Sequence, residues 1–168
     1  MLRLLSFIFK GKIMEEIKKE KMELADLYPT IELLLSMGES FCFYPSGKSM
    51  LPTLRPGRDS VLLSPVREIK KDDMLLYRRT NGVFVLHRVV RVEADGTLVF
   101  RGDNQYYDEK GITREQIIGG VYLYKRGERE IDCSSLSHRA YLRRRALSYP
   151  LRRFCFRAVN KIKRSFRK

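Results

Sequence analysis

The sequence predicts a mainly β fold: a coiled antiparallel β-sheet of barrel-like form, with short N-terminal helices and a basic amphipathic C-terminal helical tail. Two observations predict it. Between residues 40 and 126, short runs of β-branched and aromatic residues alternate with polar ones. The dipeptides Asn81-Gly82 and Asp95-Gly96 separate neighbouring runs, and each is a two-residue hairpin signal. Tight turns join antiparallel neighbours, so this pattern disfavours a doubly wound parallel sheet.

The first 39 residues form a predicted helical extension. Residues 13–27 predict one charged helix, with a thin apolar face formed by Ile13, Ile17, Met22 and Leu24. Pro29 marks the expected exit of this helix, because proline lacks the N–H group that a helix interior requires. Residues 31–37 predict a second short helix, which Gly38 ends.

Residues 40–126 form the predicted β domain. Its six expected strands are Ser40–Tyr44, Ser60–Val66, Met74–Arg78, Val83–Glu93, Thr97–Arg101 and Ile117–Lys125. The run Thr113-Arg114-Glu115-Gln116 has the spacing of a capping box and predicts one helical turn before the last strand.

Residues 127–168 form the predicted basic tail. From His138 to Lys168 there are 12 Lys or Arg residues and no Asp or Glu, so the tail supplies 12 of the formal charge of +14. An apolar stripe recurs at three- and four-residue steps along it, formed by Leu147, Leu151, Phe154, Ala158, Ile162 and Phe166.

Such a stripe among arginines is typical of a helix that lies in a membrane interface. Near an anionic leaflet each basic residue contributes about 1 kcal/mol, so the tail predicts an anionic membrane surface as partner. The expected membrane-binding residues are Arg143, Arg144, Arg145, Arg152, Arg153 and Phe154. Two alternatives remain open: the stripe packs on the protein's own core, or the arginines bind nucleic-acid phosphates. No recognition motif accompanies the arginines, so we expect no specific nucleic acid.

The composition argues against metal and disulfide chemistry. Three widely spaced cysteines without a Cys-x-x-Cys pair predict neither a disulfide framework nor a zinc site. Two histidines without a His-Glu-x-x-His motif make a metallopeptidase improbable, so we expect no metal and no cofactor. The apolar opening, residues 2–9, is far shorter than the roughly 20 residues of a spanning helix, and no cleavage site follows it. We therefore expect a cytoplasmic protein, peripheral on the inner face of the membrane if the tail binds lipid.

Three segments carry candidate chemistry. A serine hydroxyl needs a base to attack a carbonyl, and of the two histidines His87 lies in an alternating run that shares a face with Val85 and Val89. Burial on that face favours the neutral imidazole, which accepts a proton. Asp103, in a Gly-Asp-Asn turn, is the expected orienting acid, and Asp108 is the second choice. Taken singly, each residue also fits a structural role, as a turn serine, a core histidine or a turn aspartate.

The order of these segments along the chain and their residue sequences resemble the signal peptidase I superfamily over about residues 31–125. The matching motifs are Gly47-Lys48-Ser49-Met50-Leu51-Pro52-Thr53-Leu54, Gly57-Arg58-Asp59-Ser60-Val61, Asp73-Met74-Leu75-Leu76-Tyr77, Val85-Leu86-His87-Arg88-Val89-Val90, Arg101-Gly102-Asp103-Asn104 and Ile117-Ile118-Gly119. The histidine matches the Ser-His branch rather than the Ser-Lys branch. The resemblance implies an all-β catalytic core, Ser49 as nucleophile, His87 as base and Asp103 as acid. A second acid usually follows five or six positions later, where this chain has Asp108 and Glu109.

The resemblance predicts a serine endopeptidase that cleaves a peptide or preprotein leader through an acyl-enzyme. Gly47 stands where many members carry a serine, so the oxyanion would be held by backbone N–H groups, that of Ser49 included; Met50 and Pro52 belong to the same substrate-facing segment. The membrane-spanning anchor of secretory members is not evident. Two alternatives remain: a repressor-like regulatory autoprotease, and a non-catalytic membrane- or peptide-binding module of the same fold.

Overall fold

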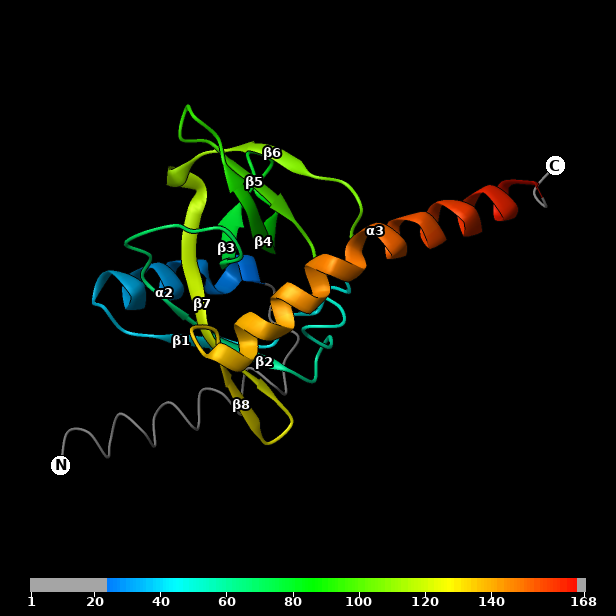
Figure 1. Ribbon diagram of the computed structural model, residues 1–168. Coiled ribbons are helices and arrows are strands. Elements are labelled where there is room, and N and C mark those ends of the chain that lie inside the picture. Colours follow the sequence, from blue (N-terminus) through cyan, green and yellow to red (C-terminus); the bar gives the residue numbers. More distant parts are fainter. Residues whose placement is uncertain (1–23, 166–168) are drawn as a thin grey trace. The chain divides into compact units, whose positions relative to one another are not determined.

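The computed structural model describes residues 24–165, and for residues 151–153 and 155–165 it describes the backbone alone. Contacts divide the chain into two units, one ending at Cys133 and the other beginning at Ser134. Within the described residues the first unit is mainly β, with one α-helix and one short 3-10 helix, Arg114–Gln116, and the second contains the long helix α3, Leu136–Ser165 (Figure 1). The expected fold class is therefore confirmed at the level of an antiparallel β protein with added helices.

An eight-stranded antiparallel sheet forms the first unit (Figure 1). Its strands are β1 (Phe41–Phe43), β2 (Ser60–Ser64), β3 (Met74–Arg78), β4 (Phe84–Val92), β5 (Leu98–Arg101), β6 (Glu109–Ile112), β7 (Ile117–Arg126) and β8 (Arg129–Asp132). The strand order is β1-β2-β7-β3-β4-β5-β6, and β8 pairs with β7. The sheet is open, which corrects the barrel-like form expected from the sequence: β1 and β6 end the path and do not pair with each other.

The helix α2, Leu24–Ser36, contains Pro29, which we expected to separate two helices. Leu27, Ile31 and Leu35 lie one turn apart and are buried, so a single apolar face runs across the proline. Proline removes one helical hydrogen bond, and burial of this face against the sheet outweighs that loss. The part of the predicted helix before Leu24 lies outside the described residues.

Both predicted hairpins are present, but each loop has three residues rather than two. Arg79 N donates to Val83 O across the first loop, and Glu93 N donates to Thr97 O across the second. Gly82 and Gly96 adopt positive φ angles of 85° and 83°, whereas the residue before each does not. A two-residue type I′ turn needs positive φ at both central positions, so the chain adopts the longer loop with one left-handed glycine.

Two apolar clusters lie on the two faces of the sheet. The first joins α2 to β1, β2, β3 and β7, and it includes Ile31, Phe43, Leu63 and Leu76. The second includes Leu75, Tyr77, Val89 and Phe100. Successive residues of a strand point to opposite faces, so β3 and β4 contribute side chains to both.

Candidate active site

His87 lies on β4, on the face of the sheet that carries the second apolar cluster. Paired residues of antiparallel neighbours share a face, and the register pairs His87 with Leu75 and Val85 with Tyr77. The pairing of Phe100 with Glu109 brings β6 into the same face. His87 is only 2% exposed, so the sequence-based expectation that its imidazole is buried is what the structure shows.

Tyr77 and Glu109 contact this imidazole. The Tyr77 hydroxyl lies 3.3 Å from His87 Nδ1 and donates a 2.8 Å hydrogen bond to Glu109 Oε2. A carboxylate only accepts, so the single phenolic proton is used on Glu109, and the phenolic oxygen is left to accept from Nδ1–H. This arrangement places the imidazole proton on Nδ1 and leaves Nε2 with a free lone pair, the tautomer that a general base needs.

The pKa of His87 is lowered to about 4. Burial is the largest cause, and the nearby Arg79 charge adds to it, while the charges of Glu109 and Asp103 act in the opposite direction. The imidazole is therefore neutral near pH 7 and able to accept a proton.

Arg79 holds Glu109 in place. Its guanidinium donates two hydrogen bonds of 2.5 Å to the two carboxylate oxygens. Burial would raise the pKa of Glu109, but the hydrogen bonds from Arg79 and Tyr77 outweigh it and lower the pKa. Glu109 thus stays charged, and its Oε2 lies 3.9 Å from His87 Nδ1.

Asp103, the expected orienting acid, accepts hydrogen bonds from Arg88 and Thr53. Arg88 Nε and Nη2 each donate to it at 2.9 Å, and Thr53 Oγ1 donates to Oδ2. All three groups are buried. Asp103 acts on His87 through its charge, and its hydrogen bonds join the loop that follows Ser49 to β4.

Asp108, the second candidate for the orienting acid, contacts a different set of side chains. Its carboxylate accepts from Arg101 Nε at 2.6 Å and lies 3.6 Å from Arg91 Nη1. Its neighbour Glu109 is the carboxylate that the structure places beside the His87 ring. The resemblance named Glu109 beside Asp108 as a candidate second acid, whereas Tyr77 and Arg79 were not among the expected site residues; the pairing of β6 with β5 is what brings Glu109 across from Phe100.

Ser49 lies in the turn-rich segment between β1 and β2, and its side chain is partly exposed. Asn104 N donates to the Ser49 carbonyl at 2.6 Å, and Asn104 Nδ2 donates to the Lys48 carbonyl at 3.3 Å. Gly102 packs so closely that a Cβ there would lie 2.8 Å from the Ser49 carbonyl oxygen. The predicted nucleophile loop and the Gly-Asp-Asn turn are thus in direct contact.

The rest of the Ser49 segment is anchored to the sheet. Met50 is buried in the first apolar cluster, and Arg126 of β7 donates to the carbonyls of Pro52 and Thr53. Gly47 is exposed and has only Ser49 Oγ, at 4.0 Å, near its missing Cβ. Among the described residues no hydrogen bond joins Ser49 Oγ to His87, so the nucleophile–base contact stays a prediction.

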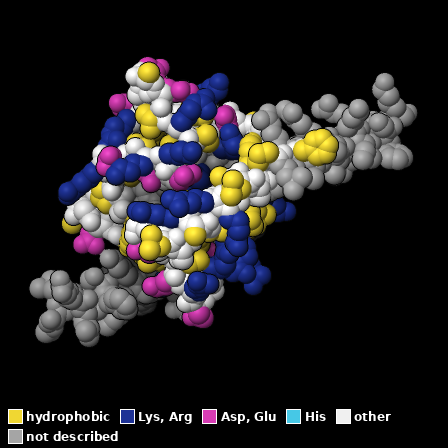
Figure 2. All heavy atoms as spheres, in the orientation of Figure 1, with side chains coloured by type: hydrophobic (Ala, Val, Ile, Leu, Met, Phe, Trp, Pro, Cys, Tyr) yellow, Lys and Arg dark blue, Asp and Glu magenta, His cyan; other side chains and the backbone are white. Residues whose placement is uncertain are grey.

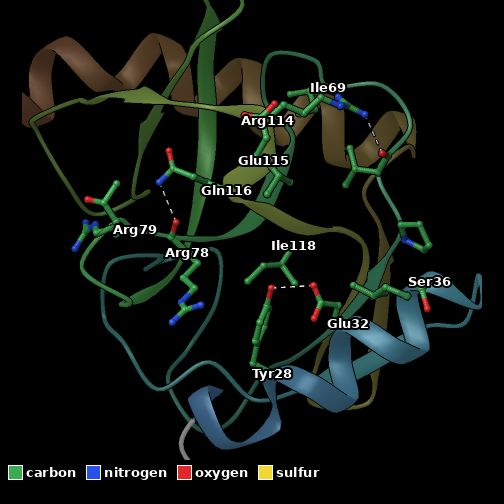
Figure 3. A pocket seen from close by; sticks show the side chains of 15 residues that line it. Tyr28, Glu32, Ser36, Ile69, Arg78, Arg79, Arg114, Glu115, Gln116 and Ile118 are labelled. Atoms are coloured by element: carbon green, nitrogen blue, oxygen red, sulfur yellow. Dashed lines mark hydrogen bonds between the residues drawn. The ribbon is translucent and has the colours of Figure 1, made fainter.

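A pocket of about 630 Å³ lies apart from these groups (Figure 3). Tyr28 and Glu32 of α2, Arg78 and Arg79 at the end of β3, and Gln116 and Ile118 are among the residues that line it. Ser49, His87 and Asp103 do not line it. Arg79 lines this pocket and also donates to Glu109, but the expected nucleophile and base lie outside the lining, so the pocket is not where a peptide bond would meet the serine.

The predicted tail begins with β8 and continues as α3. Leu147 and Phe154 of the predicted stripe are 83% and 71% exposed. Arg143 and Arg144 are exposed and Arg145 is partly buried, whereas the side chains of Arg152 and Arg153 lie outside the described set. In residues 24–165 no helix combines the length and apolar character needed to cross a bilayer.

The chain matches no protein-family model and no curated protein. The function is therefore inferred from the motif resemblance and from the geometry of these residues.

Proposed function

We propose that this chain is a serine endopeptidase of the signal-peptidase type. The observation that carries the proposal is the buried, neutral imidazole of His87, whose Nδ1 is occupied by the Tyr77–Glu109 pair. An imidazole held in this way offers Nε2 to accept a proton from a nucleophile. The motif resemblance names Ser49 as that nucleophile, and its loop is held to the same sheet through Asp103 and Asn104.

In the proposed reaction Ser49 Oγ attacks the carbonyl carbon of a peptide bond while His87 Nε2 takes the hydroxyl proton. The C–N bond then breaks, His87 gives the proton to the departing amine, and an acyl-ester on Ser49 remains. Water, activated by the same imidazole, hydrolyses the ester and regenerates the serine. Backbone N–H groups near Gly47 and Ser49 would hold the oxyanion.

The resemblance implies a substrate in extended form, laid against a strand edge, with small residues before the cleaved bond. A leader peptide or a membrane-associated precursor on the cytoplasmic side fits this description. Tyr77, Glu109 and Arg79 act as positioning residues for His87 in this proposal, and Asp103 positions the nucleophile loop.

Covalent labelling tests the proposal. The full chain is treated with β-lactam-type and peptide-based acylating probes, and adducts are mapped by mass spectrometry. We expect an adduct on Ser49 that is absent in Ser49→Ala and in His87→Gln. Ser46→Ala, an exposed serine of the same loop, is the matched control and keeps the adduct. Folded protein that gives no adduct with any probe, or an adduct that persists without His87, would overturn the assignment.

A further inference from the structure

The helix α3 carries three large apolar side chains that are exposed. Leu136 is 82% exposed, Leu147 83% and Phe154 71%. Eleven residues, about three helical turns, separate the first pair, and seven residues, about two turns, separate the second. All three side chains therefore lie along one line on the helix surface, about 27 Å long. Figure 2 shows hydrophobic side chains, in yellow, along the described part of α3.

Basic side chains border this line, which we call the apolar line of α3. Arg139 and Arg144 are exposed and lie on either side of it, three and eight positions after Leu136. Arg143 lies within the line and is exposed; its long apolar stem can lie along the line while the guanidinium reaches outward. From His138 to the end of the chain there is no acidic residue, so nothing in this segment offsets the positive charge.

We propose that α3 binds an anionic lipid bilayer surface, lying in the interface with its apolar line inserted. An apolar line inserts among acyl chains, and basic residues on its borders then meet the phosphate layer, which is the arrangement of interfacial amphipathic helices. Water does not stabilise three exposed large apolar groups in a row, whereas a bilayer does. This surface belongs to α3 alone and does not depend on the proposed peptidase activity.

Nucleic acid would use the same arginines differently. Phosphate binding by a duplex requires the positive charges but gives no role to Leu147 or Phe154. The exposed apolar line therefore favours the bilayer, and it supplies a means of separating the two partners by substitution.

The test is flotation of the full-length protein with vesicles of phosphatidylcholine alone and with vesicles in which about 30% of the lipid is anionic phosphatidylglycerol. We expect binding to the anionic vesicles, weakened by salt, and little binding to the neutral ones. The Leu147→Gln/Phe154→Gln double variant keeps every charge and should lose about tenfold or more in affinity. The matched control is Leu33→Gln/Met37→Gln, which removes two exposed apolar groups at the end of the first unit's helix and should leave binding unchanged.

A second variant, Arg139→Gln/Arg143→Gln/Arg144→Gln, should reduce binding and flatten its salt dependence. Circular dichroism confirms that each variant is folded. Equal binding to neutral and anionic vesicles, or none to either, would overturn the proposal. So would tighter binding to duplex DNA that the Leu147/Phe154 variant leaves intact, or a dimer that this variant dissociates in the absence of any vesicle binding.

Discussion

The hydroxyl group of Tyr77 donates to Glu109, 32 residues further along the chain, and the same oxygen lies 3.3 Å from His87 Nδ1. A neutral phenol thus stands between the imidazole and the carboxylate, and Arg79 balances the carboxylate charge. Glu109 therefore helps to orient the imidazole, while its charge raises the pKa of His87 by less than burial lowers it. Proton position and protonation state of His87 are controlled by different contacts.

Tyr77→Phe separates these two effects. The change removes the acceptor for Nδ1–H, so the imidazole should populate both tautomers, and we expect the rate of Ser49 acylation to fall at least about tenfold. Stability should fall by about 1–3 kcal/mol, because Glu109 loses a partly buried hydrogen bond. The nitrogen NMR signals of His87 report the tautomer directly. Tyr122→Phe, at an exposed tyrosine of β7, should change neither property. An unchanged His87 tautomer in Tyr77→Phe would contradict the positioning role.

The pH dependence of acylation should follow the lowered pKa of His87. The reaction requires the neutral imidazole, so its rate should hold as pH falls through 6.5 and drop only near pH 4. Measuring the labelling rate from pH 3.5 to 8 checks this. A half-maximal rate near pH 6.5 would show that the imidazole is more exposed to water than the structure has it.

Stability should depend on the same group. The unfolded chain protonates His87 near pH 6.5 and the folded chain only near pH 4, so the unfolded state binds more protons between these values. The full contribution is present above pH 6.5 and is lost progressively as pH falls to 4, amounting to about 3 kcal/mol. Urea unfolding of the wild type and of His87→Gln across this range gives the difference, and parallel pH curves for the two proteins would refute it.

Asp103→Asn should both destabilise the fold and release the nucleophile loop. The substitution leaves Arg88 buried and charged without its partner, a change that costs about 3–5 kcal/mol. It also weakens the contact with Thr53, so we expect slower acylation of Ser49 in the protein that remains folded. Glu68→Gln, which breaks the exposed pair with Lys70, is the control and should cost less than about 1 kcal/mol. An effect of Asp103→Asn no larger than that of the control would argue against the buried pair.

Gly102→Ala should displace the Ser49 segment. The added Cβ would meet the Ser49 carbonyl oxygen at 2.8 Å and Gln105 Oε1 at 2.9 Å, and the first of these is backbone that cannot move without the loop. We expect about 1–3 kcal/mol of destabilisation and a clear loss of labelling. Gly96→Ala controls for stability: its φ of 83° makes it a strained site with nothing within 4 Å, far from the serine loop in the fold. It should lose about 1 kcal/mol and keep its labelling rate; equal labelling by both variants would exclude the close approach as a determinant.

Local sequence signals predicted most of the strands because each signal is a short pattern. The six expected segments coincide with β1, β2, β3, β4, β5 and β7 to within two residues at each end, since alternation and turn glycines act over a few residues. The strands β6 and β8 were missed. The sequence of β6, Glu-Lys-Gly-Ile, has no alternation, and it becomes a strand only because β5 offers it a pairing edge. The Pro29 helix was misjudged for a similar reason, because packing of α2 outweighed a local rule.

In the candidate site, too, local sequence patterns predicted some features, and others depended on strand pairing. Burial of His87 followed from the spacing of Val85 and Val89, and the Gly-Asp-Asn turn followed from its residue types. The Tyr77 contact did not follow, and Glu109 was named only as one of two candidate second acids, because both residues reach His87 through pairings between strands. A long-range contact of this kind depends on the register between paired strands, which is hard to predict from a single sequence.

His87 and Arg88 are adjacent on β4 and therefore project to opposite sides of the strand, one to the Tyr77–Glu109 pair and the other to Asp103. A slip of β4 by one position would exchange them, placing a guanidinium where the base belongs and an imidazole where the loop is clamped. The register of this one strand therefore sets both the surroundings of the proposed base and the clamp on the proposed nucleophile loop. If the proposed function holds, a chain whose β4 has not yet paired in this register lacks both arrangements, so we expect no acylation of Ser49 before β4 joins the sheet.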